Sequence, residues 1–513
     1  MRRLVALAVA ACAIHAAGAL AAAPTGFLAL FPRRTGCSAG LGAGSAGLRA
    51  QAEGAARRRV VVVGGGVGGL AVAGRLARAR PDWQLTVLEK KTRVGGRVDE
   101  LARQGFRFDT GPTLLLAKDI YEETFLALGS ALQDHVELRR VDPAYLCVLS
   151  DNTNVTLTAD LGRMREQLER IEPGSFHNYL AYMREACINY VRGFGSRPFQ
   201  SKDNALSDYA NLDNVWLLRD FDASNLLMTH LDRLRRFFRS PRLHELFSFQ
   251  DLYIGLAPHT APAIFSLLQH LEIVEGVWYP VGGFQRLIQA LDGLVRRAGV
   301  EVRTAAPVAQ IMLDESSRRA TGVCLASGET IECDLVISNV DLPMSYAALL
   351  PTDRPPLRGR VARLAALDYS SGVVAFYWCL SRKVPELEHH TTFLSPGGQG
   401  SWDLIYAATA QVPDDPSFYV CCPGKTDPSA APAGKECVMV LVPCGCMPQD
   451  GEGGGGDFDE VRDRARCAVL RRLRQVGVEI EALIEHEVVY TPAEWRAVGA
   501  CMKHDGVIVQ ASA

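Results

Sequence analysis

Four consecutive β-branched residues, Val60 to Val63, open the most informative stretch of the chain. A run of this kind predicts a strand that is buried on both faces, as in a parallel sheet. The segment from Leu70 to Ala79 is rich in alanine, and its apolar residues recur at the 3.6-residue period of a helix. A second apolar run, Leu85 to Leu88, predicts another strand, which ends at Glu89. The order strand, helix, strand is the one that a nucleotide-binding βαβ unit requires.

Three glycines connect the first predicted strand to the helix, and Gly64, Gly66 and Gly69 satisfy the pattern G-x-G-x-x-G. The first permits a tight turn, the second lets the backbone approach a pyrophosphate, and the third allows helix and strand to pack closely. A helix that begins near Gly66 offers free N–H groups and the positive end of its dipole to a phosphate. Glu89 lies 20 positions after Gly69 (89 − 69), where its carboxylate can accept hydrogen bonds from ribose hydroxyls and would repel a 2′-phosphate.

A second glycine turn, Arg93-Val94-Gly95-Gly96-Arg97, follows the second strand. Arginine suits a pyrophosphate because its planar group makes paired, charge-assisted hydrogen bonds, although a solvated basic turn would contain the same residues. The pattern E-K-x-x-R-V-G-G-R from Glu89, followed by G-F-R-F-D-T-G-P at 105–112, resembles the flavoprotein superfamily of amine oxidases and carotenoid desaturases. It resembles most closely the bacterial-type phytoene desaturases.

This resemblance implies that FAD is the cofactor and indicates which residues bind it. The backbone near Asp109 would face the cofactor, although residues 105–111 would read equally well as an ordinary strand end. The backbone of Val308 would contact the adenine. The residues expected to bind FAD are Gly64, Gly66, Gly69, Glu89, Lys90, Arg93, Gly96, Arg97, Thr110, Gly111 and Val308.

The resemblance and the changes of pattern along the chain predict an α/β fold in several parts. A Rossmann-type FAD-binding domain of the glutathione reductase kind is expected to be discontinuous, with one part at 59–160 and the other at 276–345. Strand patterns become rare over 161–275, which is expected to form an inserted helical region that contacts substrate and membrane. Residues 346–495 are expected to form a mixed-sheet substrate domain.

The helical region contains a basic and apolar stretch, Met228 to Phe249. Leu231, Leu234, Phe237 and Phe238 fall on one helical face and are surrounded by arginines, which suits an anionic bilayer surface. A helix packed on the protein core would show the same pattern. The resemblance favours peripheral membrane association, because the substrates of the family dissolve only in membranes.

An apolar and aromatic segment at 246–283 resembles the desaturases almost throughout. Its large side chains could line a tunnel for a long apolar substrate, or they could belong to a hydrophobic core. The residues concerned are Phe247, Phe249, Tyr253, Ile254, Phe265, Leu267, Leu268, Trp278 and Tyr279.

Composition narrows the picture further. A chain of 513 residues with 48% hydrophobic residues can bury a sizeable core in two or three domains, and its net charge of −2 gives no reason to expect nucleic acid as a partner. The fourteen cysteines form no C-x-x-C pair, so neither a zinc site nor a disulfide framework is indicated, and buried thiols are expected. His259, His270 and Glu272 lack metal-ligand spacing, and no metal site is predicted.

Both ends of the chain differ from its middle. Residues 1–23, with Arg2 and Arg3 before an Ala/Leu-rich run, predict a signal peptide, and 24–58 resembles a transit peptide, which together predict a plastid location. The resemblance covers 59–495 and stops before the late segment with which family members cover the flavin. Residues 496–513 are therefore expected to be a divergent, truncated C-terminus that leaves FAD weakly bound.

The predicted function is FAD-dependent desaturation of phytoene or a later carotene intermediate. A hydride would pass to the flavin while a proton leaves the neighbouring carbon, and a quinone or oxygen would accept the electrons. No side chain stands out as the base, so no catalytic residue is predicted. A carotenoid cis–trans isomerase of the same family and an inactive truncated product are the alternatives. An amine oxidase is disfavoured by the desaturase-like segments that begin at Leu246 and Val412.

Overall fold

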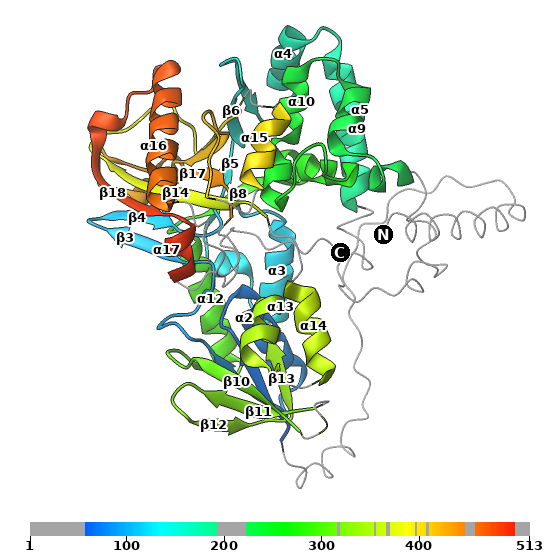
Figure 1. The fold of residues 1–513 in the computed structure, drawn as a ribbon, viewed down its shortest axis with the longest axis vertical. Helices are drawn as coiled ribbons and strands as arrows, with labels where there is room; N and C mark the ends of the chain where they lie inside the picture. The colour runs from blue at the N-terminus through cyan, green and yellow to red at the C-terminus, as the bar shows by residue number, and fades with distance from the viewer. Residues whose placement is uncertain are drawn as a thin grey trace, which may run out of the picture.

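The computed structural model describes residues 57–191, 222–314, 316, 319–352, 355–365, 370–395, 398–406, 410–446 and 457–497. The predicted signal peptide lies outside these residues, and so do the transit-like segment up to residue 56 and the C-terminus beyond residue 497. The architecture is α/β, with a lower lobe built on a parallel sheet and an upper lobe built on a mixed sheet and a group of helices (Figure 1).

The parallel sheet of the lower lobe has four strands in the order β13 (Leu335–Ser338), β1 (Arg59–Val63), β2 (Gln84–Leu88) and β9 (Glu301–Arg303). All neighbours pair in parallel. Helix α2 (Val67–Ala79) connects β1 to β2 and contacts α12 (Phe284–Arg297). This is the Rossmann-type unit that the sequence predicts, and its strands come from both predicted parts of the domain.

Strand β1 shows why four β-branched residues stand in a row. Val60 and Val62 belong to the core that includes residues of α2 and α12, whereas Val61 and Val63 belong to a second core on the other face. A three-stranded antiparallel sheet supplies that second core, formed by β10 (Val308–Leu313), β11 (Ala320–Leu325) and β12 (Thr330–Glu332). Both faces of the strand are therefore dry, which requires apolar residues at every position.

The upper lobe contains a seven-stranded sheet. Its order is β18 (Ile484–Tyr490), β14 (Gly372–Leu380), β17 (Glu436–Cys444), β16 (Phe418–Cys421), β15 (His390–Phe393), β6 (Tyr145–Val148) and β7 (Asn154–Leu157). Only the pair β15 and β6 is parallel among these neighbours. Helix α16 (Phe458–Gln475) covers one face, and the hairpin of β3 (Glu100–Arg103) and β4 (Phe106–Asp109) contacts the other.

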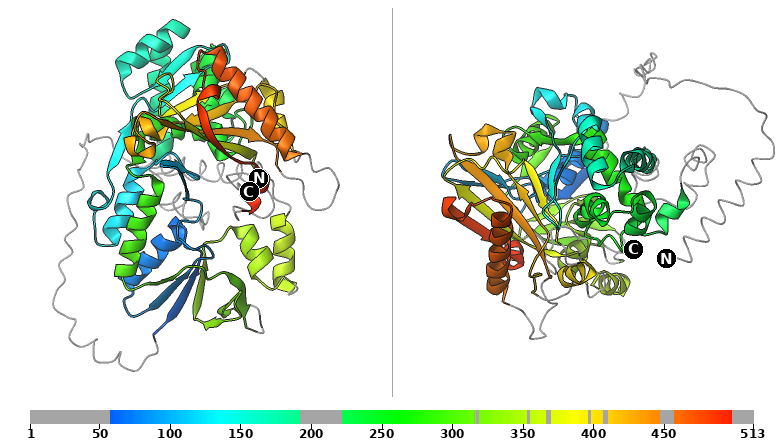
Figure 2. Two further views of the ribbon diagram at one scale, coloured as in Figure 1. Left: turned by 90° about the vertical axis from the view of Figure 1, so that its left-hand side faces the viewer. Right: turned by 90° about the horizontal axis from the view of Figure 1, so that it is seen from above.

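The sheet topology moves one predicted domain boundary. Strands β6 and β7 lie before residue 160, in the stretch assigned to the FAD-binding domain, yet they extend the sheet of the upper lobe. The chain enters the upper lobe earlier than predicted, because the hydrophobic pattern of a strand does not reveal which sheet it joins. The left view of Figure 2 shows the two sheets in separate lobes.

The predicted helical region is mostly helical where the structure describes it, with turns and loops at 172–174, 238–240 and 255–262. It contains α4 (Leu161–Ile171), α5 (Ser175–Asn189), α9 (His230–Phe237), α10 (Pro241–Ser248) and α11 (Leu267–Gln269), together with a π-helix at His270–Gly276. The remaining α-helices and strands are α3 (Lys118–Ala127), β5 (Leu138–Val141), β8 (Val277–Pro280), α13 (Leu342–Met344), α14 (Pro355–Ala365), α15 (Gly398–Ile405) and α17 (Pro492–Ala497). No helix among the described residues is long and apolar enough to cross a membrane.

The basic stretch Met228 to Phe249 is not one amphipathic helix facing outward. It divides into α9 and α10 because Pro241 disfavours helical geometry at the preceding residue. Leu234 and Phe238 are buried in the main hydrophobic core, where Phe238 stacks on Phe247 with ring centroids 5.1 Å apart. The interpretation of this apolar face as a bilayer contact is therefore wrong for these side chains. Phe247 and Tyr279, two candidates for a substrate tunnel, belong to the same core.

Candidate functional site

A cavity of about 850 Å³ lies at the carboxyl ends of β1 and β2, where residues of both lobes meet. Its walls come from the two glycine turns, the segment that follows β4, the segment that follows β13, and β18 with α17. Ten of the eleven predicted cofactor-binding residues line it: Gly64, Gly66, Glu89, Lys90, Arg93, Gly96, Arg97, Thr110, Gly111 and Val308. The structure therefore brings together residues that are up to 244 positions apart in the chain (308 − 64).

The eleventh residue, Gly69, lies beneath the cavity and has a packing role. A β-carbon at this position would lie 2.0 Å from the carbonyl oxygen of Gly64, so only glycine lets α2 approach β1. Gly64 itself has φ +100°, a conformation that other residues rarely adopt. Helix α2 begins after Gly66, and no side chain caps its first turn. The N–H groups of that turn therefore remain available to an anion.

The second glycine turn lies directly against the first. Gly95 N–H donates to the carbonyl oxygen of Gly65 at 2.9 Å, and Gly66 and Gly95 form a parallel bridge. A β-carbon on Gly96 would lie 3.1 Å from Cα of Gly66. Backbone thus faces backbone without intervening side chains, which leaves the close approach that a diphosphate needs.

Glu89 lies beside the first glycine turn, as its place at the end of β2 predicts. Its side chain is only 4% exposed, and Oε2 accepts a hydrogen bond from Gly65 N–H at 2.8 Å while Oε1 accepts one from Lys91 N–H at 2.9 Å. A carboxylate oxygen has two lone-pair positions, so each oxygen can accept a further bond from a ribose hydroxyl. The protein backbone alone fixes the orientation of this acid.

Three basic residues of the cavity, Lys91, Arg93 and Arg97, are already paired with carboxylates. Arg97 pairs with Asp341, which follows β13, and Arg93 pairs with Asp99. Lys91 Nζ also lies 3.0 Å from Asp99. Burial opposes ionisation of Asp99, but a backbone N–H and these two cations hold its pKa below the usual value. A diphosphate in the cavity would compete with these carboxylates for the arginine side chains.

Several residues in the cavity wall were missed from the sequence, and five of them come from segments far along the chain from the glycine turns. They are Asn339, Asp341, Met344, Tyr490 and Trp495. Asn339 follows the parallel strand next to β1, so the rule that ligands bind at the carboxyl ends of such strands could have found it. Tyr490 and Trp495 contact each other edge to face at 4.9 Å and come from the upper lobe, so no local pattern marks them.

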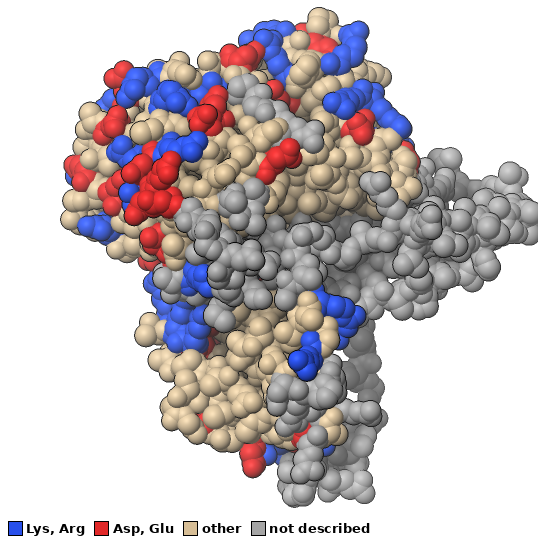
Figure 3. Space-filling view, in the orientation of Figure 1, with Lys and Arg blue, Asp and Glu red and all other residues tan. Residues whose placement is uncertain are grey.

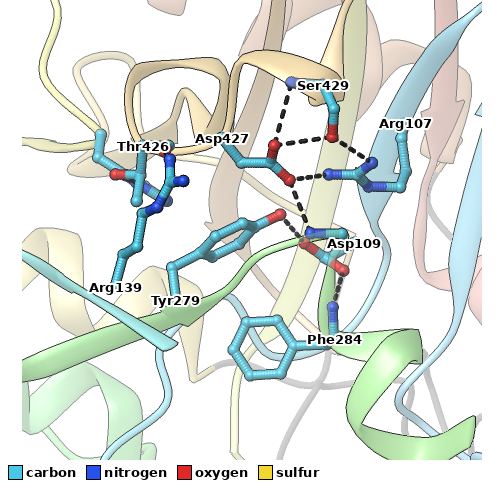
Figure 4. Close-up of polar contacts among 10 residues, drawn as sticks. Arg107, Asp109, Arg139, Tyr279, Phe284, Thr426, Asp427 and Ser429 are labelled. Atoms are coloured by element: carbon cyan, nitrogen blue, oxygen red, sulfur yellow. Dashed lines mark hydrogen bonds and ion pairs between the residues drawn. The ribbon is translucent and has the colours of Figure 1, made fainter. Parts of the chain in front are cut away.

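Asp109, next to the cavity residues Thr110 and Gly111, has a structural role through its side chain. Oδ1 accepts a hydrogen bond from Phe284 N–H at 2.8 Å, at the start of α12, and Oδ2 accepts one from the hydroxyl of Tyr279 at 2.8 Å (Figure 4). Burial raises the pKa of Asp109 to about 6, although both hydrogen bonds favour the ionised form. The acid therefore holds the strand that carries Thr110 against the helix.

A buried ion pair lies beside this contact. Arg107 on β4 pairs with Asp427 at 2.5 Å, and the same carboxylate oxygen accepts a hydrogen bond from Gly282 N–H at 2.8 Å (Figure 4). Asp427 also accepts bonds from the backbone N–H and the hydroxyl of Ser429. One carboxylate thus joins the turn after β16 to β4 and to the segment that leads into α12.

The family profile for flavin-containing amine oxidoreductases matches residues 67–498, which include most of the cavity wall. The chain belongs to this family. As a family member it is an oxidoreductase with FAD as its cofactor. The side-chain-free contact between the two glycine turns, the uncapped start of α2 and the acid at the tip of β2 fit the diphosphate and ribose of that cofactor.

Curated relatives of the chain include enzymes that act on carotenoids. It is 37% identical over 449 residues to a phytoene desaturase of Phycomyces blakesleeanus, which covers 86% of this chain and 74% of the relative. It is 38% identical over 440 residues to a zeta-carotene-forming phytoene desaturase of Myxococcus xanthus, covering 85% and 81%. Among solved structures, a putrescine oxidase bound to putrescine aligns with a TM-score of 0.55 at 14% identity over 88% of both chains, a likeness of fold alone.

Proposed function

We propose that this family member is a carotenoid desaturase that oxidises phytoene or a later carotene intermediate. The proposal rests chiefly on the 37–38% identity to phytoene desaturases over about 85% of the chain. The structure also supports the proposal, because the cavity at the glycine turns is lined by the residues expected to bind FAD.

The chemistry assigns distinct tasks to the cofactor and to the chain. Bound FAD supplies a hydride acceptor, so a carbon–carbon single bond can become a double bond when a proton leaves the neighbouring carbon. The two glycine turns would hold the diphosphate, Glu89 would hold the ribose, and Arg93 and Arg97 would face the negative charge. Tyr490 and Trp495 close part of the cavity with aromatic surface, which excludes water from that wall.

The decisive experiment measures products with and without an electron acceptor. The purified flavoprotein is incubated with phytoene in lipid vesicles, without oxygen, with and without an added quinone. We expect more desaturated product than bound flavin only when an acceptor is present, because each flavin accepts one hydride and must then be reoxidised. Products of unchanged mass without an acceptor would instead identify an isomerase.

We further propose that the protein acts at a membrane surface, where its substrate is dissolved. Basic side chains gather on the helical part of the upper lobe (Figure 3). Arg235, Arg236 and Arg239 are exposed there and border a hollow of about 370 Å³ between α4 and α9. Replacing these three arginines with glutamine should reduce co-sedimentation with vesicles that contain anionic lipid. Equal sedimentation of both proteins would contradict this surface.

The proposed location is a plastid, on the strength of the predicted signal peptide and transit-like segment at 1–58. A fusion of residues 1–60 to a fluorescent protein should be imported into plastids of an alga whose plastid is of secondary origin. Fluorescence that remains in the cytosol would exclude this location.

A further inference from the structure

Two histidines and a cysteine form a buried cluster in the sheet of the upper lobe, away from the residues that line the cavity. His389 precedes β15, His390 begins it, and Cys421 ends β16. One ring nitrogen of each histidine and Sγ of Cys421 all lie within 4.8 Å of one another. The three residues are 2%, 0% and 2% exposed, respectively.

Backbone pairing fixes this arrangement. His390 and Cys421 are direct partners across the antiparallel pair of β15 and β16, so their side chains leave the sheet on the same face. Cys422 N–H donates to the carbonyl oxygen of His389 at 2.8 Å and continues the pairing by one residue. The rings of His389 and His390 have centroids 4.2 Å apart.

Each imidazole is held through one nitrogen. His389 Nδ1 lies 2.5 Å from Oγ1 of Thr426, and His390 Nδ1 lies 2.6 Å from the hydroxyl of Tyr419, which in turn lies 2.9 Å from Oγ1 of Thr113. Metal-binding histidines are oriented in this way, since the nitrogen that is not a ligand is bonded to a second group.

The other nitrogen of each ring has no partner. Nε2 of His389 and Nε2 of His390 are buried and make no hydrogen bond within the described part of the chain. An unpaired buried nitrogen costs free energy, which a ligand at this position would recover.

We propose that His389, His390 and Cys421 bind a d¹⁰ metal ion of the Zn²⁺ or Cu⁺ class. Imidazole and thiolate are the ligands that these ions prefer, and their preferred geometries do not require a fourth protein ligand. Binding displaces the thiol proton of Cys421 to solvent, and no electron is transferred. Ligand atoms around a tetrahedral zinc lie roughly 3.3–3.6 Å apart, and the three atoms here lie within 4.8 Å of one another, so binding contracts the cluster by at most about 1.5 Å.

The test uses two adjacent cysteines as a matched pair. Cys422 is as buried as Cys421, but its side chain lies in the core on the opposite face of the sheet. The full chain with FAD, the variant Cys421→Ser and the variant Cys422→Ser are each incubated with Zn²⁺ or with Cu⁺ under reducing conditions, desalted, and analysed for metal and flavin. We expect about one equivalent of metal in the unaltered protein and in Cys422→Ser, and at least a tenfold lower affinity in Cys421→Ser.

A spectroscopic measurement with Co²⁺ reports the thiolate ligand directly, so it does not depend on the stability of the variants. Co²⁺ in a site with a thiolate ligand absorbs at longer wavelengths than oxidised flavin, and this absorption should appear in Cys422→Ser but not in Cys421→Ser. Tyr419→Phe, which removes the partner of His390 Nδ1, should weaken binding roughly 10–100-fold. The proposal is overturned if neither metal is retained, if both serine variants retain metal equally, or if only a bridging water occupies the cluster in an experimental structure.

Discussion

At the scale of single residues, Gly69 has no room for a side chain. A β-carbon would lie 2.0 Å from the carbonyl oxygen of Gly64, closer than any two such atoms can approach. Gly69→Ala should therefore force α2 away from β1, which would displace the first turn of the helix from the cavity. We expect a loss of several kcal/mol of stability and of most bound flavin, measured by denaturant unfolding and by the flavin-to-protein absorbance ratio.

Gly359→Ala is the matched control for this substitution. Gly359 lies within α14, and nothing lies within 4 Å of the position that its β-carbon would take. Alanine in an open helical position should raise stability by up to about 1 kcal/mol. A similar loss of flavin in both variants would show that the contact of Gly69 with Gly64 is not the cause.

Glu272 offers a prediction about pH. It is buried, with Oε1 3.1 Å from the hydroxyl of Tyr145 and Oε2 3.1 Å from Nε2 of Gln250, and burial raises its pKa to about 8. Because the folded-state pKa exceeds the unfolded value, this group stabilises the fold fully below about pH 4.5, and the stabilisation is lost as the pH rises through 8. The total is at most about 5 kcal/mol, at about 1.4 kcal/mol per pKa unit.

Glu272→Gln should remove this dependence, because the amide keeps the neutral form at every pH. Denaturant unfolding between pH 5 and 9 should show that the variant gains on the unaltered protein as the pH rises. Glu275→Gln is the control, since the side chain of Glu275 is 47% exposed and its replacement should change stability little at any pH. Parallel pH profiles for the unaltered protein and Glu272→Gln would contradict the assigned ionisation.

At the residue scale, the sequence identified those site residues that lie close together in the chain as well as in the fold. Gly64, Gly66 and Glu89 follow one another around a βαβ unit, so their spacing alone placed them together. Asp341 could not be found in this way, because its neighbour Arg97 lies 244 positions earlier (341 − 97) and the pair forms only in the folded chain. His390 and Cys421 are likewise joined by strand pairing, which leaves no motif in the sequence.

At the scale of elements, α12 depends on an acid from another segment. Asp109 accepts the bond from Phe284 N–H, because Gly283 before it has no side chain to cap the helix. Asp109→Ala should cost about 1–3 kcal/mol, since it leaves this N–H and the hydroxyl of Tyr279 without their partner. Flavin should also be retained less well, because Thr110 and Gly111 follow Asp109 and line the cavity.

Asp160→Ala is the control for Asp109→Ala, because it removes a helix cap that lies away from the cavity residues. Asp160 caps α4, where its side chain accepts hydrogen bonds from Gly162 N–H at 2.8 Å and Arg163 N–H at 3.1 Å. Its replacement should cost about 1 kcal/mol and leave flavin content unchanged. Unfolding curves and flavin absorbance for both variants check the comparison, and equal flavin retention in both would refute the link between Asp109 and the cavity.

Helices and strands were predicted correctly where the hydrophobic pattern of the segment itself determines its secondary structure. Helix α2 and the strands β1 and β2 follow directly from apolar period and length. The stretch from Met228 to Phe249 misled because a helix that packs on a core and one that lies on a bilayer share the same amphipathic pattern. Only the burial of Leu234 and Phe238 and the pairing of Arg233 with Glu185 distinguish the two.

At the scale of the whole molecule, Asp427 connects segments of different sheets. It joins the turn after β16 to Arg107 on β4 and to Gly282 before α12, and its side chain is only 2% exposed. Arg107→Met leaves this charge buried and unpaired. We expect a loss of about 3–5 kcal/mol in the free energy of unfolding, measured by chemical denaturation.

Arg75→Met provides the comparison for an exposed pair between two helices. Arg75 and Glu123 lie 3.0 Å apart, and their side chains are 44% and 75% exposed. Breaking this pair should change stability by less than about 1 kcal/mol, because water screens the charges. A cost for Arg107→Met as small as this would mean that the buried pair does not hold the segments together.

The division of the molecule into domains could be predicted, but the pairing of strands from distant parts of the chain could not. The interruption of the nucleotide-binding domain by a helical region was implied by the family resemblance, together with the loss of strand patterns after residue 160. The parallel pairing of β6 with β15 does not, since it joins Leu146 to Thr391 across 245 positions (391 − 146), and nothing in either strand specifies the other.

Glu89 has a practical consequence for work with this enzyme. Gly65 and Lys91 orient its carboxylate through their own amide groups, so the grip on the ribose is built before any nucleotide arrives. An apoprotein prepared by mild removal of the prosthetic group should therefore reconstitute without refolding. That permits substitution with synthetic isoalloxazines of graded midpoint potential, and the dependence of turnover on that potential would reveal whether carbon–hydrogen cleavage limits the rate.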